Sequence, residues 1–486
     1  GSHVCGFVRS MEEDGEKRSL IPDAADPRSA ARGLGGFPIA TFIYLSVAGG
    51  PYGTEGALMS AGPFPVLIGF LVLPIIWGFP VALLAAELST ALPCDSSFTA
   101  WVQKALGDVA AFTATIAAFI SGVVDMTLYP NIMVRYLILA FDYHAESWAT
   151  ILLKGGVVTF LCLLNAAGIR LAADASMLGT FILLLPFAVL TVVGIPTVDP
   201  SVWLQTTPDF NLVTYLNIML WNLGGWDSFS NVAGNIVNPG KTVPQALFLA
   251  AVILEVFSLL PILVISGNDS HWASYTNGHF MDVANQVGGE ALRFAMAAGA
   301  IVYCCTMYCY RVTAFSHQLE GMALQGLAPR LLAFRLRRDL IAVIAGDRDD
   351  EALKEGAEEG AAPPVTGSPI VAIGFVWLIS LAACPFAFGI LLKVDNVLYC
   401  IVLLAMIVSF IILRRTHPDM HRPFKIPLGT VGCALIFVPP ALIAILLIVV
   451  SGLLAQIVSA VVLSVAAISF QFMSLRLRPM RVVPVV

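Results

Sequence analysis

Charged residues are scarce in this sequence. Asp, Glu, Lys and Arg together make up 12% of its 486 residues, whereas soluble domains carry roughly 25%. Hydrophobic residues make up 58% of the chain, and the mean hydropathy is +0.86. This apolar excess extends along the whole chain, so it excludes a soluble multidomain enzyme and also a soluble domain with a single membrane anchor.

One long segment has no charge at all. Residues 426–475 form a run of 50 positions without Asp, Glu, Lys or Arg. A helix needs roughly 20 residues to cross about 30 Å of hydrocarbon, so this run holds two membrane spans. The apolar residues are continuous instead of alternating, which favours helices over the strands of a barrel. The sequence therefore predicts an all-α membrane protein.

The rest of the chain divides in the same way, which gives about twelve predicted transmembrane helices in the lipid bilayer. We expect a disordered polar tail with a tag scar at 1–33, a membrane domain at 34–476 with a cytoplasmic loop at 323–368, and a second tail at 477–486. The predicted spans cover residues 37–61, 66–91, 108–140, 149–169, 175–196, 210–236, 244–266, 291–322, 369–391, 396–413, 426–449 and 452–474.

Lysine and arginine predict the orientation of these helices. Twenty-one of the 26 basic residues fall on the side that holds both tails and the 323–368 loop. The loops on the opposite side hold Lys154 and Lys393 alone. Because cytoplasmic loops carry the excess of basic residues, we expect both termini to be cytoplasmic. The expected host is the plasma membrane.

Motifs for catalysis, metal binding and phosphate binding are missing. Nine cysteines occur, but Cys304, Cys305 and Cys309 cluster without histidines or a Cys-x-x-Cys pair. No phosphate loop, Ser-His-Asp order or zinc motif is present. We therefore expect no enzyme activity, no catalytic residues, no metal, no cofactor and no nucleic-acid partner.

Two of the predicted spans contain a glycine pair near their middle. The first reads Gly49-Gly50-Pro51, and the sixth contains Gly224-Gly225. Proline removes a backbone donor and glycine tolerates non-helical angles, so both spans should unwind locally. Unwound backbone at membrane depth persists where it lines a cavity, and paired broken helices are typical of transporter sites. The alternative is that the glycine pairs allow close helix packing.

Ionisable residues within spans are costly, which makes them candidates for function. Asp227, at the sixth-span break, is expected to contact substrate or a proton. Asp125 has the same expected role or pairs with a neighbouring donor, and Glu87 is either a proton site or a helix cap. Glu255 is expected to face a polar helix surface, and Arg311 to snorkel or pair with a carboxylate. The full set is Glu55, Glu87, Asp125, Asp227, Glu255 and Arg311.

Several strings in the chain resemble the signatures of one family. They are Gly49-Gly50-Pro51-Tyr52-Gly53-Thr54-Glu55, Pro80-Val81-Ala82-Leu83-Leu84-Ala85-Ala86-Glu87-Leu88, Trp221-Asn222-Leu223, Trp226-Asp227-Ser228, Asn238-Pro239-Gly240-Lys241-Thr242 and Arg422-Pro423-Phe424-Lys425-Ile426-Pro427. Together they resemble the amino acid–polyamine–organocation superfamily, and most closely its plant and trypanosomatid polyamine uptake transporters. The resemblance covers nearly all spans. It implies a LeuT-type fold of two inverted five-helix repeats, at about 37–196 and 210–413, plus two extra helices at 426–474.

The resemblance also implies a small cationic substrate. A polyamine has several ammonium groups and no carboxylate, so its site needs carboxylates with aromatic faces between them. Asp125 and Tyr129 are four residues apart and would share one helix face. The relatives place an aromatic residue over the substrate at the position of Trp221. The predicted substrate-binding residues are Gly49, Gly50, Tyr52, Glu55, Asp125, Tyr129, Trp221, Asn222, Trp226, Asp227 and Tyr399, and the proton-coupling candidates are Glu87, Asp125 and Asp227.

We thus expect a secondary active transporter that imports putrescine and spermidine by alternating access, with the proton as the coupling ion. The alternative within the superfamily is a permease or exchanger for cationic or neutral amino acids. The plant members tend to carry Glu where this chain has Asn235 and Met406, which leaves that alternative open. A membrane enzyme or a receptor is disfavoured by the paired broken helices.

Overall fold

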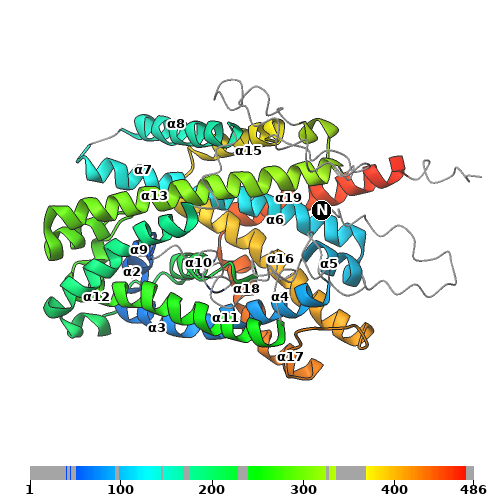
Figure 1. Ribbon diagram of the computed structural model, residues 1–486, viewed down its shortest axis with the longest axis horizontal. Helices are drawn as coiled ribbons and strands as arrows, with labels where there is room; N and C mark the ends of the chain where they lie inside the picture. The colour runs from blue at the N-terminus through cyan, green and yellow to red at the C-terminus, as the bar shows by residue number, and fades with distance from the viewer. Residues whose placement is uncertain are drawn as a thin grey trace, which may run out of the picture. The chain divides into compact units, whose positions relative to one another are not determined.

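The computed structural model describes residues 40, 44, 47, 51–92, 98–143, 146–167, 175–227, 239–324, 328–334 and 368–477. Every element in these ranges is helical, which confirms the predicted all-α class for the described part of the chain (Figure 1). Seven of the helices are long and apolar enough to cross a membrane, or eight if one pair bent by 41° counts as a span. The chain is a multi-pass integral membrane protein.

The described residues form a series of helices. Four short 3₁₀ helices, η3 (Ile195–Thr197), η4 (Pro200–Leu204), η8 (Trp272–Ser274) and η9 (Arg330–Ala333), lie among them. The other helices are α2 (Glu55–Ala61), α3 (Pro63–Leu73), η2 (Pro74–Gly78), α4 (Phe79–Ala91), α5 (Phe98–Leu106), α6 (Asp108–Met126), α7 (Leu128–Ala140), α8 (Ser147–Ala166), α9 (Ala175–Gly194), α10 (Leu212–Asn222), α11 (Pro239–Leu254), η7 (Glu255–Leu259), α12 (Leu260–Asn268), α13 (Phe280–Leu324), α15 (Ile370–Ala383), α16 (Phe388–Thr416), α17 (Thr430–Ile436), α18 (Val438–Val450) and α19 (Leu453–Leu477).

Several predicted spans agree with these bounds, but the predicted count of twelve is not confirmed by the seven or eight candidate spans among the described residues. Interrupted spans and the shorter apolar helices Leu184–Thr197 and Ile370–Ala383 are too short to be counted singly. The predicted span 369–391 was wrong at its end. Its helix stops at Ala383, and α16 begins at Phe388. Cys384 still has helical dihedral angles, but Pro385 has no N–H to donate to the Leu381 carbonyl, so the helix does not continue.

Two spans contain a π turn shortly before a proline. In η2 the N–H of Phe79 bonds to the carbonyl of Pro74, and in η7 the N–H of Leu260 bonds to that of Glu255. Each turn is followed by a proline two residues after its end, at Pro80 and Pro261. Proline cannot donate to the carbonyl four residues earlier, so the helix adopts the wider turn.

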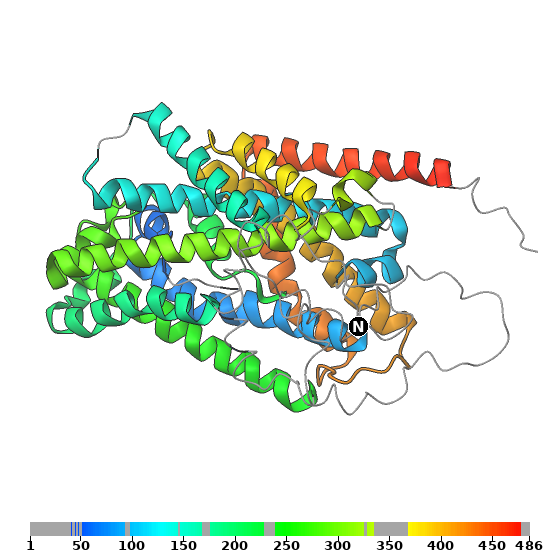
Figure 2. The same cartoon turned by 45° about the horizontal axis from the view of Figure 1, so that its top comes forward.

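The chain forms two compact units. The first comprises the described residues within Gly1–Ser121, Thr180–Ala300 and Gly389–Val486, and the second those within Gly122–Gly179 and Ile301–Phe388. In the first unit α10 packs against α2 and α3, and α18 packs against α10. In the second unit α8 packs against α7 and lies beside α15 in both views (Figure 1, Figure 2).

Candidate functional site

The sixth span is broken at Gly224-Gly225, as the sequence predicted. Helix α10 ends at Asn222, and Gly225 has a φ of 78° that only glycine adopts readily. A Cβ on Gly224 would lie 2.8 Å from the Leu220 carbonyl oxygen, so the turn also needs glycine there. The backbone therefore leaves the helix just before Trp226 and Asp227.

Asp227 contacts one member of a group of aromatic side chains. The Tyr399 hydroxyl on α16 donates a hydrogen bond of 2.9 Å to Asp227 Oδ1. The Trp77 and Tyr399 ring centroids are 6.4 Å apart, and those of Phe79 and Trp226 are 5.7 Å apart. We call Trp77, Phe79, Trp226 and Tyr399 the aromatic cluster. A carboxylate among aromatic rings suits an organic cation, because both attract positive charge.

The π turn η2 builds one wall of this cluster. Gly78 lies between Trp77 and Phe79, and a Cβ at that position would be 2.6 Å from Trp226 Nε1. The missing side chain therefore lets the Trp226 indole rest on the turn. The sequence analysis missed Trp77 and Phe79, although the Gly and Pro residues around them mark an irregular turn within an apolar run.

The first break is visible from Pro51 onward. Residues 51–54 are not helical, Gly53 has a φ of 86°, and α2 begins at Glu55. Gly49 and Gly50 lie outside the described residues. The Tyr52 hydroxyl donates a hydrogen bond of 2.8 Å to the Met296 carbonyl on α13, so Tyr52 links the break to that helix.

Glu55 occupies the first turn of α2 and is fully buried. Its Oε1 accepts a hydrogen bond of 3.0 Å from the Gly278 N–H, which joins the first break to the segment before α13. A carboxylate at a helix N-terminus offsets the positive end of the helix dipole. Glu55 therefore makes this break less attractive to the carboxylate of an amino acid.

The segment before α13 holds an acid–histidine cluster outside the spans. Asp269 Oδ1 accepts a bond of 2.8 Å from the His271 N–H, and Asp269 Oδ2 lies 2.9 Å from His279 Nε2. Burial opposes ionisation of Asp269, but these hydrogen bonds outweigh it and hold the Asp269 pKa below its ordinary value. The ring of His279 stacks on Tyr275 at 4.1 Å.

In the second unit, Asp125 and Tyr129 both contact the guanidinium group of Arg311. The span kinks at Thr127, between α6 and α7, because Pro130 cannot donate to the Met126 carbonyl. Asp125 Oδ2 lies 3.0 Å from Arg311 Nη2, and Tyr129 interacts with the same guanidinium. The expected pairing of Arg311 with a carboxylate is thus confirmed. The Asp125 carboxylate forms an ion pair with Arg311.

Glu87 is paired with two arginines and one backbone N–H. It is fully buried and accepts hydrogen bonds of 2.8 Å from Arg414 Nε and from the Ile426 N–H. Arg422 Nε lies 3.2 Å from its Oε1. Glu87 therefore ties α4 to the end of α16 and to the loop that follows. This geometry favours a structural role over the proton-coupling and capping roles that the sequence left open.

Trp221 and Asn222 lie at the end of α10. Trp221 is half-buried, and Asn222 is buried with its amide nitrogen donating 3.0 Å to the Ile218 carbonyl. Both residues lie on the helical side of the break, while Trp226 and Asp227 lie after it. Of the sequence-predicted residues in the first unit, the structure brings Asp227 and Tyr399 into direct contact.

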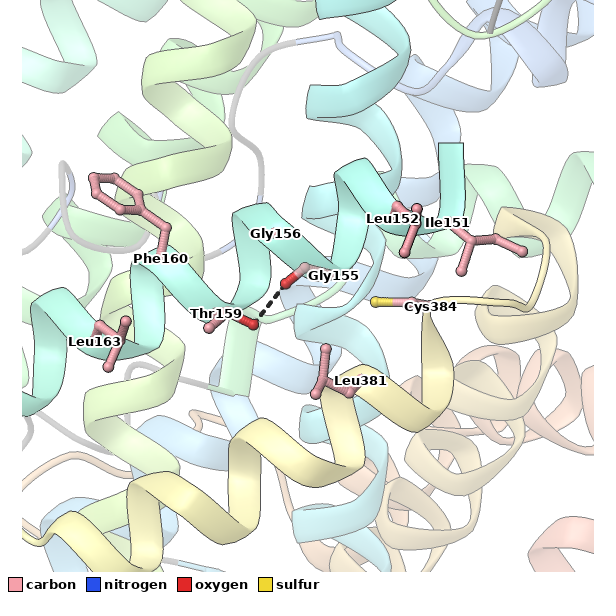
Figure 3. A pocket seen from close by; sticks show the side chains of 9 residues that line it. All are labelled: Ile151, Leu152, Gly155, Gly156, Thr159, Phe160, Leu163, Leu381 and Cys384. Atoms are coloured by element: carbon pink, nitrogen blue, oxygen red, sulfur yellow. Dashed lines mark hydrogen bonds between the residues drawn. The ribbon is translucent and has the colours of Figure 1, made fainter. Parts of the chain in front are cut away.

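A groove of about 530 Å³ lies between α8 and α15 in the second unit (Figure 3). Its described lining has no charged residue. Thr159 is satisfied there, since its hydroxyl donates to the Gly155 carbonyl and accepts from Trp377 Nε1. This groove lacks the carboxylate that an ammonium group requires, so the aromatic cluster is the better candidate for a cation site.

A broken span that places an acid beside aromatic rings within an apolar helical protein is typical of a membrane carrier. The family model for amino acid permeases matches residues 34–470. The chain belongs to the amino acid permease family, whose members are transporters and not enzymes.

Individual relatives agree with this assignment. The polyamine transporter PUT1 of Oryza sativa subsp. japonica is 34% identical over 90% of this chain and 78% of its own length. The polyamine transporter RMV1 of Arabidopsis thaliana is 31% identical over 84% of this chain and 78% of its own. The methylthioribose transporter of Bacillus subtilis (strain 168) is 24% identical over 82% of this chain and 85% of its own.

Proposed function

We propose that this protein is a secondary active transporter that imports polyamines such as putrescine and spermidine, with protons as the coupling ion. The observation that carries the proposal is the Tyr399–Asp227 hydrogen bond within the aromatic cluster at the sixth-span break. The carboxylate would hold one ammonium group, and the aromatic rings would cover the methylene chain and add cation–π attraction. The polyamine transporters among its relatives support this substrate class.

The site argues against a substrate that carries a carboxylate. Amino acid carriers of this fold bind that group at the first break, where the N-terminus of a half-helix is positive. Here Glu55 occupies the first turn of α2 and is buried. Its charge would repel a substrate carboxylate, so a permease for amino acids is the weaker candidate.

The proposed architecture is the LeuT-type fold of two inverted repeats, about 37–196 and 210–413, with extra helices at 426–474. The matching π turns η2 and η7 support it, because they interrupt the second span of each proposed repeat. Each repeat would open with a broken span. Alternating access would rock the first, second, sixth and seventh spans against a scaffold. The grouping of parts of the third, fourth, eighth and ninth spans into one compact unit supports such a scaffold.

The proposed setting is the plasma membrane with both termini in the cytoplasm, as the distribution of basic residues indicates. The proposed substrate contacts are Gly49, Gly50, Tyr52, Glu55, Asp125, Tyr129, Trp221, Asn222, Trp226, Asp227 and Tyr399. Trp77 and Phe79 join them on the basis of the aromatic cluster.

A binding competition with the purified protein tests the substrate class. Labelled putrescine is bound at equilibrium and then displaced by spermidine, by lysine or by arginine. Displacement by spermidine alone supports the proposal, because the amino acids carry a carboxylate that the site repels. Equal displacement by lysine or arginine would favour the amino acid permease.

A further inference from the structure

Glu255 is an ionisable residue in the middle of the seventh span, at the start of the π turn η7. The turn exists because Pro261 cannot donate to the carbonyl four residues before it. Single π turns within helices occur frequently at functional sites. The sequence analysis expected Glu255 to face a polar helix surface. The helices that pack against η7 are instead apolar in the described part of the chain.

One oxygen of the Glu255 carboxyl group has no hydrogen-bond partner among the described residues. Glu255 Oε2 is buried and receives no hydrogen bond from any described residue, and the same is true of Ser258 Oγ in the same turn. Charged carboxylates elsewhere in the spans have partners. Glu87 has two arginines, Asp125 has Arg311 and Asp227 has the Tyr399 hydroxyl.

In the described part of the chain, the helices that pack most closely against η7 offer no counter-charge near Glu255. Helices α3, α11 and α12 pack against the turn. Between their first and last residues these helices contain one titratable side chain, Lys241, which lies 14 residues before Glu255 near the start of α11. The nearest aromatic hydroxyl among the ring contacts of the turn belongs to Tyr44, whose ring centroid is 6.3 Å from that of Phe257. An ionised Glu255 would therefore lack both a cation and a donor among the described residues.

A carboxyl group in this setting is stable when it carries a proton. Burying an isolated carboxylate is expensive, and such a group neutralises itself instead of remaining charged. The proton-coupling candidates named from the sequence are all engaged with donors or cations. Glu87 and Asp125 are held in ion pairs, and Asp227 and Glu55 accept hydrogen bonds, whereas the buried Oε2 of Glu255 has no donor among the described residues.

The two π turns occupy matching places in the proposed repeats. Residues of η2 and its flank contribute Trp77 and Phe79 to the aromatic cluster. The repeat-related turn η7 carries Glu255 and Ser258. A change in the seventh span that exposed its π turn to water would therefore bring an acid into contact with solution.

We propose that Glu255 is the proton-binding site of the transporter. One proton binds to the Glu255 carboxylate from the side at which polyamine enters, and it leaves from the carboxylic acid on the other side. The O–H bond is the bond that forms and breaks, and no other reactant is consumed. This assignment rests on the proposed function for its role in transport, while the protonation itself can be measured without substrate.

Infrared difference spectroscopy tests the protonation directly. Purified protein in lipid is compared at neutral and alkaline pH in the region where the C=O group of a protonated carboxylic acid absorbs. We expect a band in the wild-type protein that is absent in Glu255→Gln. The matched control is Glu290→Gln, because Glu290 is 62% exposed beside Arg293 and belongs to no proposed site. That control should keep the band. Loss of the band in Glu290→Gln, or its persistence in Glu255→Gln, would overturn the assignment.

Transport by the same variants tests the coupling. In liposomes, Glu255→Gln should exchange internal for external putrescine at close to the wild-type rate, while accumulation driven by an inward proton gradient falls at least tenfold. Glu255→Asp keeps a titratable group and should recover part of the accumulation. Wild-type accumulation by Glu255→Gln would overturn the assignment. A wild-type protein that neither binds nor exchanges putrescine would contradict the proposed function instead, and the infrared band would still decide whether Glu255 is protonated.

The melting temperature provides a third test. Because Gln matches the shape of a neutral Glu, Glu255→Gln should leave the melting temperature of the protein close to that of Glu290→Gln. A large drop confined to Glu255→Gln would indicate that the carboxylate is ionised and paired in the resting state, which contradicts the proposal.

Discussion

The Tyr399 hydroxyl donates a hydrogen bond of 2.9 Å to Asp227 Oδ1, across 172 positions of the sequence. This contact orients the carboxylate beside the sixth-span break and keeps Tyr399 within the aromatic cluster. The donor is a neutral hydroxyl, so the bond orients the carboxylate without neutralising its charge. The relationship links the break in one helix to a residue of α16.

Asp227→Asn should weaken polyamine binding by about 10- to 150-fold, because a charge-assisted hydrogen bond contributes roughly 1.5–3 kcal/mol. Equilibrium binding of labelled putrescine measures the effect. Asp209→Asn is the control, since Asp209 is exposed. Unchanged affinity in Asp227→Asn would remove this residue from the site.

Tyr399→Phe should weaken binding less than Asp227→Asn does. It removes the donor that orients Asp227 but leaves the ring and the carboxylate in place. We expect a loss of roughly tenfold, from about 1.5 kcal/mol for one hydrogen bond to a charged group. Tyr143→Phe at an exposed tyrosine is the control. A larger loss for Tyr399→Phe than for Asp227→Asn would show that the carboxylate is not the main contact.

Gly78→Ala should impair transport, because the new methyl group would lie 2.6 Å from Trp226 Nε1. Overpacking of this kind costs about 1–3 kcal/mol, and it would displace the indole from the turn. Gly374→Ala on α15 is a matched control, since no heavy atom lies within 4 Å of the added Cβ. Uptake and melting temperature should therefore fall in the first variant alone. Normal uptake by Gly78→Ala would mean that the Trp226 position is not critical.

The contacts of Glu87 with Arg414 and Arg422 should contribute to the stability of the protein. Glu87→Gln leaves Arg414 and Arg422 without their buried acid, and breaking such a pair costs roughly 3–5 kcal/mol. Thermal unfolding in detergent measures this loss, with Glu290→Gln as the exposed control. A normal melting temperature combined with lost proton coupling would restore Glu87 as a proton site.

Stability should also depend on pH through Asp269. Its hydrogen bonds lower its pKa, so the stability that they contribute is present at neutral pH. That contribution is lost as the pH falls below the ordinary value of 3.8. Asp269→Asn should therefore melt below the wild type at pH 7, and the difference should shrink toward about pH 3. A difference that grows as the pH falls would have the wrong sign.

The sequence predicted the elements better than their contacts. Charge-free runs located the spans, and the glycine pair located the break before Asp227, since both are local signals. The pairing of Glu87 with Arg414 joins residues 327 positions apart, and no local pattern encodes the register between such helices. Trp77 and Phe79 were missed for the same reason. Their role comes from a π turn and from Trp226, which approaches from another span.

The most direct measurement is the uptake of radiolabelled putrescine by the purified protein in liposomes, with and without an inward proton gradient. The proposed function predicts accumulation above equilibrium when the gradient is present. It also predicts equilibration without accumulation when the gradient is collapsed, and competition by spermidine but not by lysine or arginine. Gradient-independent uptake would contradict proton coupling. Uptake of amino acids without uptake of putrescine would contradict the proposal that polyamines are the substrates.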